Sequence, residues 1–81
     1  RPATRRNPFG LTAREMEILA CVARGLTNSR IGTALGVSTK TVDHHVSAIL
    51  AKLGATTRAD ASRMAQAHDL LPRDGQEKIA I

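Results

Sequence analysis

The sequence predicts an all-α fold, a four-helix bundle that contains a helix-turn-helix, within 81 residues. Apolar residues recur at spacings of three and four, which is the period of a helix with one buried face. A Thr or Ser precedes each periodic segment and a Gly follows three of them, as expected for helix starts and ends. The predicted helices span about residues 12–24, 27–35, 38–53 and 57–68.

The first predicted helix begins at Thr12, and Glu15 follows three residues later in the pattern of a capping box. Leu11 and Met16 flank this start at the spacing of a hydrophobic staple. The residues that follow turn an apolar face toward the core, and Gly25 ends the helix.

The next two predicted helices are separated by only three residues, Gly36, Val37 and Ser38. Thr27 caps the shorter helix, and Gly36 supplies the left-handed residue that ends it. Ser38 caps the longer helix, and Gly54 ends it. The buried stripe of the longer helix consists of Val42, Val46, Ile49 and Leu53. Helices joined by so short a turn must cross steeply, which is helix-turn-helix geometry.

A fourth helix is expected to begin at Thr57, with Asp60 three residues on as a partial capping box. Its inward positions are Ala61, Met64 and Ala65. The helix is expected to end near His68, and the apolar residues that follow close it against the core.

One domain is expected at residues 11–71, preceded by a linker or N-terminal arm at 1–10 and followed by a flexible tail at 72–81. The chain starts with Arg rather than Met, and its opening stretch RPATRRNP combines three Arg with two Pro, which is typical of a linker. The last residues mix charges with a Gly and keep no helical period. We therefore expect the chain to be the C-terminal piece of a longer protein.

Lys and Arg outnumber Asp and Glu by 12 to 7, which gives a formal net charge of +5 and favours a polyanionic partner. Phe9 is the only aromatic residue, so single-stranded nucleic acid, which binds by stacking, is a poor candidate ligand. A domain of this size has little interior for a catalytic cavity, and its acidic residues are scattered among capping and surface positions. We expect no catalytic residues and no enzyme activity.

Cys21 is the single cysteine, so no intramolecular disulfide can form; it is either a small apolar residue of the core or a redox switch. No apolar run approaches the length of about 20 residues that a bilayer span needs, and we expect a cytoplasmic protein that does not enter a membrane. His44 and His45 point about 100° apart on a helix, and no further ligand completes a zinc site. We expect no metal, no cofactor and no small-molecule ligand.

The outward face of the third predicted helix carries mostly short polar side chains. Opposite the buried stripe lie Lys40, Asp43, His44, Ser47 and Ala51, flanked by Thr41, His45, Ala48 and Lys52. A major groove about 12 Å wide admits a helix only if its outward side chains do not hold it away. Lys40 and His44 can donate to guanine, and Ser47 can donate or accept. The sequence therefore predicts that this helix reads double-stranded DNA.

Some of these assignments have alternatives. The carboxylate of Asp43 can accept from cytosine N4 or exclude wrong sequences, or it serves instead as an intrahelical partner of Lys40. The backbone amides at the starts of the second and third helices form anion sites, so Thr27, Asn28 and Ser38 are candidate phosphate contacts. For Thr27 and Ser38, capping alone is the alternative.

A series of motifs in order resembles the LuxR-type, or GerE-like, helix-turn-helix DNA-binding domain: Leu11-Thr12-Ala13-Arg14-Glu15, Gly25-Leu26-Thr27-Asn28, Thr41-Val42, His45-Val46, Ile49, Lys52-Leu53-Gly54 and Arg58. The resemblance covers residues 11–71 and implies a third helix in the major groove of promoter DNA, with dimerisation through the fourth helix on inverted-repeat sites. The stretch TVDHHVSAIL is similar to such domains at the C-termini of large multidomain bacterial transcriptional regulators with ATP-binding or cyclase-like sensory regions.

The resemblance implies functional positions residue by residue. Base reading falls on Asp43, His44 and Ser47, and phosphate contact falls on Thr27, Asn28, Lys40, Thr41, His45 and Lys52. Glu15 and Arg58 match framework positions instead. Many members carry Lys, Glu and Asn where this chain has Asp43, Arg30 and Ala48, and Gly32 replaces a usual Ala. The base preference of the common members therefore does not carry over to this chain.

The fourth predicted helix carries a candidate homodimer interface, whose alternative is ordinary solvent exposure. Its residues off the inward stripe are Ala59, Ser62, Arg63 and Gln66. Two rival functions fit the same fold. One is a protein-interaction module that contacts RNA polymerase or a regulator through the third helix, suggested by Asp43. The other is a promoter-reading domain of the sigma-factor type, against which the motifs at 25–28 and 52–54 argue.

Overall fold

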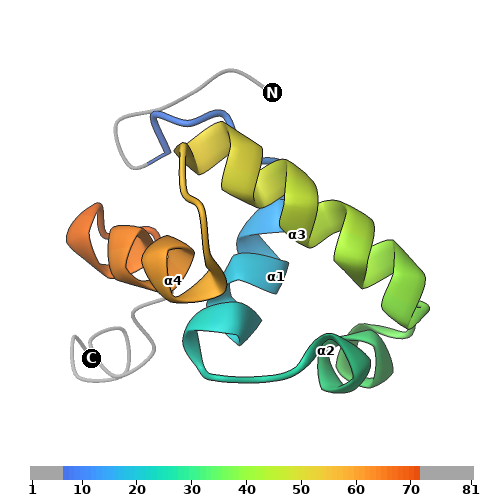
Figure 1. The fold of residues 1–81 in the computed structure, drawn as a ribbon. Coiled ribbons are helices and arrows are strands. Elements are labelled where there is room, and N and C mark those ends of the chain that lie inside the picture. Colours follow the sequence, from blue (N-terminus) through green and yellow to red (C-terminus); the bar gives the residue numbers. More distant parts are fainter. Residues whose placement is uncertain (1–6, 72–81) are drawn as a thin grey trace, which may run out of the picture.

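The computed structural model describes residues 7–71, and within this range every regular element is a helix (Figure 1). The helices are α1 (Ala13–Ala23), α2 (Asn28–Leu35), α3 (Thr39–Leu53) and α4 (Arg58–Ala67). The predicted all-α fold is confirmed, and each predicted helix agrees with the observed one to within one residue at either end, once its N-cap is set apart. The expected tail at 72–81 and the first part of the expected arm, 1–6, lie outside the described residues.

Each helix starts at the predicted N-cap residue. In all four, the side-chain oxygen of the cap accepts the backbone N–H three residues later; the caps are Thr12, Thr27, Ser38 and Thr57. Glu15 completes the capping box of α1, because its Oε1 accepts the backbone N–H of Thr12 at 2.9 Å. Asp60 does not complete one in α4, since its carboxylate pairs with Arg63 one turn on.

The four helices also end in one repeated way. A residue with positive φ follows each helix: Gly25, Gly36, Gly54 and Asp69. The next residue donates its N–H to a carbonyl five residues back: Leu26 to Cys21, Val37 to Gly32, Ala55 to Leu50 and Leu70 to Ala65. This is the hydrogen bond that satisfies an orphan carbonyl at a helix end. Each donor residue is apolar and packs into the core or against it, so the closures also anchor the ends.

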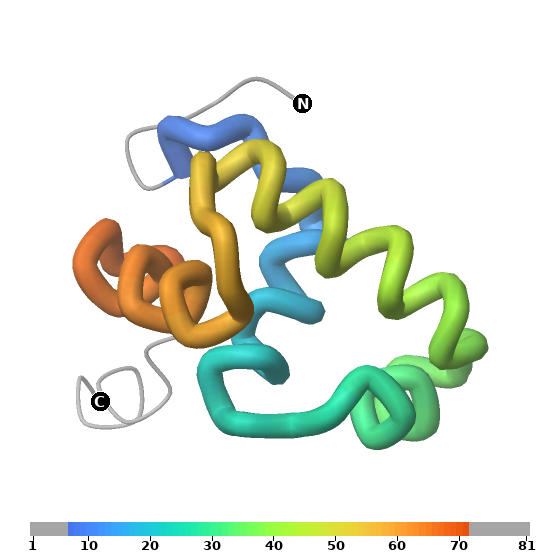
Figure 2. The backbone as a smooth tube through the Cα atoms, in the orientation of Figure 1, coloured from blue at the N-terminus to red at the C-terminus, as the bar shows by residue number. Residues whose placement is uncertain are grey.

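The helices pack around one core. α1 lies against both α3 and α4, and α2 lies against α3. In Figure 1, α3 runs across the view while α2 is seen nearly end-on, which is the steep crossing that the short turn predicts. Figure 2 shows the segment before α1 passing beside the C-terminal end of α3. Of the inward positions expected on the fourth helix, Met64 is only half-buried and packs against the edge of the core.

Gly32 explains how closely α2 approaches the turn that follows it. This residue is buried, and a Cβ added to it would lie 2.6 Å from the backbone carbonyl oxygen of Val37. That distance is too short for a side chain, so the turn would have to shift to accept one. Gly32 therefore permits a tight junction between α2 and α3.

We expect Gly32→Ala to lower the free energy of unfolding by on the order of 1 kcal/mol. Alanine gains about 1 kcal/mol of helix propensity, but displacing the Val37 carbonyl costs about 1–3 kcal/mol. Urea denaturation followed by circular dichroism measures the difference. Thr33→Ser, at the exposed neighbouring position, is the control; its helix propensity is similar, so it should leave stability nearly unchanged. A more stable Gly32→Ala variant would contradict the proposed close approach.

Candidate nucleic-acid interface

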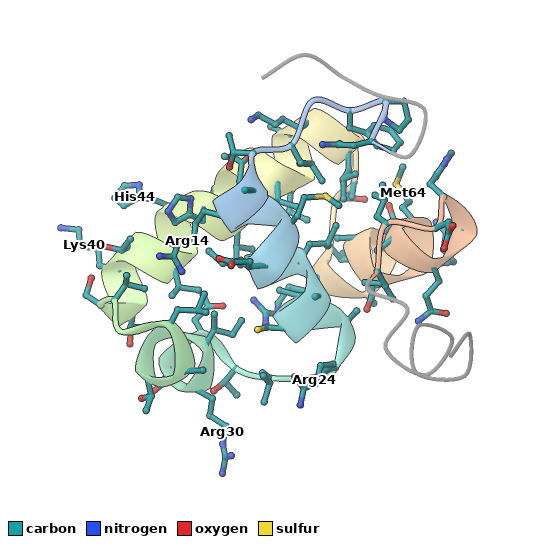
Figure 3. The ribbon with its side chains drawn as sticks, turned by 180° about the vertical axis from the view of Figure 1, so that it is seen from behind. Arg14, Arg24, Arg30, Lys40, His44 and Met64 are labelled. Carbon is teal, nitrogen blue, oxygen red and sulfur yellow. The ribbon has the colours of Figure 1, made fainter. Side chains whose placement is uncertain are left out.

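The outward face of α3 is exposed over its whole length. Lys40, Asp43, His44, Ser47 and Ala51 are all exposed. The opposite stripe, formed by Val42, Val46, Ile49 and Leu53, is buried, with at most 7% of any of these residues accessible. Figure 3 shows Lys40 and His44 projecting from α3 away from the bundle. The helix therefore presents a continuous polar surface that no other described element covers.

The intrahelical pair that was one alternative for Asp43 is not formed, and base reading stays a prediction. Within residues 7–71 no ion pair joins its carboxylate to Lys40, although the two lie three residues apart on the helix. Both side chains are exposed. The face thus offers an acceptor at Asp43, flanked by donors at Lys40 and His44.

The start of α3 holds a small hydroxyl pair. The Ser38 hydroxyl donates to Thr41 Oγ1 at 2.9 Å, and its oxygen accepts the Thr41 backbone N–H at 3.0 Å. Because Thr41 Oγ1 is the acceptor of the first bond, its own hydrogen remains to be donated. His45, one turn further along the flank, is half-buried.

Arg58 joins the start of α4 to the start of α2. Its Nη1 donates to Asn28 Oδ1 at 2.6 Å, and its Nη2 donates to the carbonyl oxygen of Leu26 at 2.7 Å. Thr27, between these acceptors, uses its hydroxyl oxygen to cap α2 through the Arg30 N–H. The resemblance implies that Arg58 is a framework residue. Consistent with this, its guanidinium group makes a forked hydrogen bond that joins two parts of the bundle.

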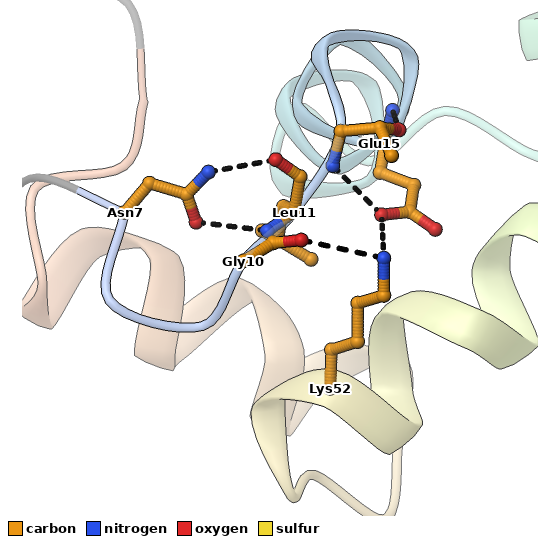
Figure 4. A network of polar contacts seen from close by, with 6 residues as sticks. Asn7, Gly10, Leu11, Glu15 and Lys52 are labelled. Carbon is orange, nitrogen blue, oxygen red and sulfur yellow. Dashed lines mark hydrogen bonds and ion pairs between the residues drawn. The ribbon is translucent and has the colours of Figure 1, made fainter. Parts of the chain in front are cut away.

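Lys52 joins the end of α3 to the start of α1 (Figure 4). Its Nζ lies 2.7 Å from Glu15 Oε1 and donates to the carbonyl oxygen of Gly10 at 3.4 Å. Glu15 is buried, with 5% of the residue accessible. The resemblance implies that Lys52 contacts a phosphate. In the structure its ammonium group binds Glu15 and Gly10 and so helps to hold the fold together. The phosphate contact stays a prediction.

The ionisation of Glu15 follows from these contacts. Burial raises the pKa of this carboxyl group, but the hydrogen bonds from Lys52 and Thr12 and the charge of Lys52 outweigh it. The pKa of Glu15 is therefore lowered from its ordinary value. The carboxylate is charged at neutral pH and holds the arm, α1 and α3 together.

Exposed cations extend the basic surface beyond α3. Arg14, Arg24 and Arg30 are exposed on α1, after it and on α2, and Figure 3 shows them spread over one side of the molecule. Arg14 pairs with Glu17 at 3.3 Å on the surface of α1. Arg24 and Arg30 have no ion-pair partner among the residues that the structure describes.

Three anchoring contacts of the arm had no part in the sequence predictions. Asn7 Nδ2 donates to the Leu11 carbonyl at 2.7 Å, and Asn7 Oδ1 accepts the Leu11 N–H at 3.1 Å. Phe9 packs edge-on against His68, with ring centroids 5.0 Å apart. The Asn-Pro dipeptide at 7–8 was an available signal for a turn. The pairing of Phe9 with His68 has no local signal, because these residues lie far apart in sequence.

Metal binding and membrane crossing are two properties outside DNA binding. In the described part of the chain, no cluster of three or more His, Cys, Asp and Glu residues is arranged to hold a metal ion. None of the helices at 7–71 has the length and apolar character needed to cross a membrane. Cys21 is half-buried and packs against the core.

In the helix-turn-helix formed by α2 and α3, the polar face of α3 is exposed. This arrangement defines a class of bacterial regulatory domains. Residues 10–65 match the luxR family of bacterial regulatory proteins, also called GerE, which confirms the resemblance. The chain belongs to this family.

Two relatives are regulators by name, one a transcriptional activator and the other a response regulator. Over 62 residues the chain is 40% identical to the HTH-type transcriptional activator RamA of Corynebacterium glutamicum, which covers 76% of this chain and 22% of RamA. Over 61 residues it is 46% identical to the response regulator protein VraR of Staphylococcus aureus, which covers 75% of this chain and 29% of VraR. The chain thus spans less than a third of either relative. Family and relatives together support a role in DNA-binding transcription regulation.

The lowered pKa of Glu15 predicts an acid-sensitive contribution to stability. A carboxylate whose folded pKa is below its unfolded value stabilises the fold above the unfolded pKa, and this contribution is lost as the pH falls through the folded value. We expect Glu15→Gln to be less stable than the wild type at neutral pH and to lose less stability on acidification. Urea denaturation at a series of pH values from about 7 to about 3 measures both slopes.

Glu17→Gln is the matched control, because Glu17 is exposed and its pair with Arg14 lies at the surface. Its pH dependence should follow that of the wild type. Lys52→Met keeps the aliphatic stem but leaves the buried Glu15 without its cation, so it should cost about 1–3 kcal/mol at neutral pH. Equal acid slopes for Glu15→Gln and the wild type would contradict the assigned ionisation.

Proposed function

We propose that this domain is the output domain of a bacterial transcriptional regulator and that it binds double-stranded DNA with sequence preference, with α3 in the major groove. The observation that carries the proposal is the exposed polar face of α3 opposite a fully buried stripe. A helix anchored in this way can enter a groove without uncovering its core. The net charge of +5 supports an encounter driven by phosphate attraction.

Base reading is assigned to three side chains on the exposed face. His44 donates to guanine N7 or O6, Asp43 accepts from cytosine N4, and Ser47 donates or accepts. The exposure of all three and the absence of an ion pair between Asp43 and Lys40 support these assignments. Ala51, further along the face, leaves room for the groove wall.

Phosphate contacts are assigned around this face. The side chains are Thr27, Asn28, Ser38, Lys40, Thr41, His45 and Lys52. Lys40 is exposed and carries a full charge, and the Thr41 hydroxyl keeps a hydrogen to donate. Thr27 and Ser38 each use one backbone N–H in a capping bond, and the remaining amides in the first turns of α2 and α3 are the donors proposed to meet a phosphate beside them. Lys52 contributes charge near the end of α3 while it pairs with Glu15.

We further propose that the domain works in the cytoplasm as a homodimer on inverted-repeat sites. The dimer face is on α4, where Ala59, Arg63 and Gln66 are exposed and Ser62 is half-buried. In a symmetric dimer the same surface meets itself, and recognition helices of such dimers lie about one DNA turn apart. RNA polymerase is a further candidate partner, and the acidic Asp43 is the feature that supports it.

Selection from a library of random duplexes, at two salt concentrations, tests sequence-specific binding. We expect an enriched inverted or half-site motif and an affinity that falls steeply with salt. His44→Ala should cost about 1–3 kcal/mol at the selected site and little on random DNA. Glu17→Gln, which changes an exposed charge on α1, is the control. If no motif is enriched and the domain instead retains RNA polymerase, the interaction-module function replaces this one.

Ala59→Glu tests the dimer face. Ala59 is exposed in the first turn of α4, where an acidic residue favours the helix, so the fold should be kept. A symmetric interface would bring two carboxylates together, and binding to an inverted repeat should weaken by about tenfold or more. Titration of a duplex with a single half-site, measured by fluorescence anisotropy, should give an unchanged affinity. Equal affinity of the variant and the wild type for the inverted repeat would rule out this face.

A further inference from the structure

We infer that Arg58 is a positioning residue that holds the side-chain amide of Asn28 with its NH2 group turned toward the DNA backbone. The inference rests on the proposed function and adds to it a residue that touches no DNA itself. It links the first turn of α4, which carries the proposed dimer face, to a proposed phosphate contact on α2.

The geometry is a two-pronged bond from one guanidinium group. Arg58 Nη1 donates to Asn28 Oδ1 at 2.6 Å, while Nη2 donates to the Leu26 carbonyl at 2.7 Å. The second bond fixes the plane of the guanidinium group against the loop before α2. The first bond then fixes the Asn28 amide against that plane, and both partners are half-buried.

The chemistry of the two groups gives the amide a direction. A guanidinium group can only donate, so it selects the oxygen of an Asn side chain and leaves the NH2 group on the other side. The Nδ2 of Asn28 has no hydrogen-bond partner among residues 7–71. A phosphate accepts hydrogen bonds, so the fixed orientation offers it a donor. Without Arg58 the amide can rotate and present its oxygen, which a phosphate repels.

A purely structural function of Arg58, in holding the loop through Leu26, makes a different prediction. The double-mutant cycle below separates the two, and Asn28→Asp first tests the donor on which it depends, because a carboxylate has the same shape and still accepts from Arg58 but has no hydrogen to donate. It also places a negative charge at the first residue of α2, which favours the helix. Asn28→Asp is therefore expected to be a stable variant that lacks the donor at this position.

We expect Asn28→Asp to unfold at the same temperature as the wild type or higher and to bind a fluorescently labelled random-sequence duplex about tenfold or more weakly. Glu17→Gln and Arg24→Gln measure how affinity changes when an exposed position gains or loses one unit of charge. Asn28→Asp and Arg24→Gln each lower the net charge by one unit. The loss of affinity in Asn28→Asp should therefore exceed the loss in Arg24→Gln. A loss no larger than that of Arg24→Gln overturns the inference.

A double-mutant cycle then tests whether Arg58 acts through Asn28. Arg58→Lys keeps the charge but cannot make the planar fork, and Asn28→Ala removes the amide. We expect Arg58→Lys to weaken DNA binding in the wild type and to have less than a twofold effect in the Asn28→Ala background. An equal loss in both backgrounds means that Arg58 acts on its own or through the loop, and the inference is wrong.

The wild-type domain distinguishes the failure of this inference from the failure of the proposed function. If the unaltered chain shows no salt-dependent affinity for the duplex, DNA binding itself fails. If the wild type binds and Asn28→Asp binds equally well, DNA binding stands, but the phosphate contact of Asn28 and its positioning by Arg58 are both wrong.

Discussion

Short helices lose much of their hydrogen bonding at their ends, because the first four N–H groups and the last four C=O groups have no partner within the helix. α2 has only eight residues and α4 has ten, so this constraint covers most of their length. A hydroxyl cap at each start and a left-handed residue at each end supply partners. The residue after each left-handed position is apolar and lies in or against the core, so closing an end also fixes where it sits. The placement of all four helices depends on this closure.

Two cations then join elements that are distant in sequence. Lys52 connects the end of α3 with the start of α1, and Arg58 connects the start of α4 with the loop before α2. Hydrogen bonds from charged donors are stronger than neutral ones, and the acceptors here are partly or fully shielded from water. The buried core is built from aliphatic side chains, and these bonds add directional restraints to its packing. The same helices carry the proposed DNA and dimer contacts.

The sequence predicted those features that depend on residues three or four positions apart. The caps, the glycine ends, the buried stripe of α3 and its exposed face all follow from local chemistry and period. Asp69 was missed because the left-handed residue there is not Gly, although Asp tolerates that conformation better than most side chains. The partner of Lys52 could not be predicted from the residues alone, because pairing across 37 positions depends on the tertiary fold. Spacing alone does not decide which exposed pairs form, since Arg14 and Glu17 pair across three residues while Lys40 and Asp43, at the same spacing, do not.

The tight junction at Gly32 affects the angle at which α3 leaves the turn. The helix has 15 residues, and at about 1.5 Å of rise per residue it extends about 22 Å from the turn that holds it. Its far end is anchored by buried Leu53 and by the bond of Lys52 to Glu15, so a shift of a few tenths of an ångström in the Val37 carbonyl moves chiefly the first turns of the helix. The inner surface of the turn can therefore alter the angle at which these first turns meet a partner, with the contacting side chains unchanged. Variation at a buried position that touches no ligand thus offers a way to change which sites related domains prefer.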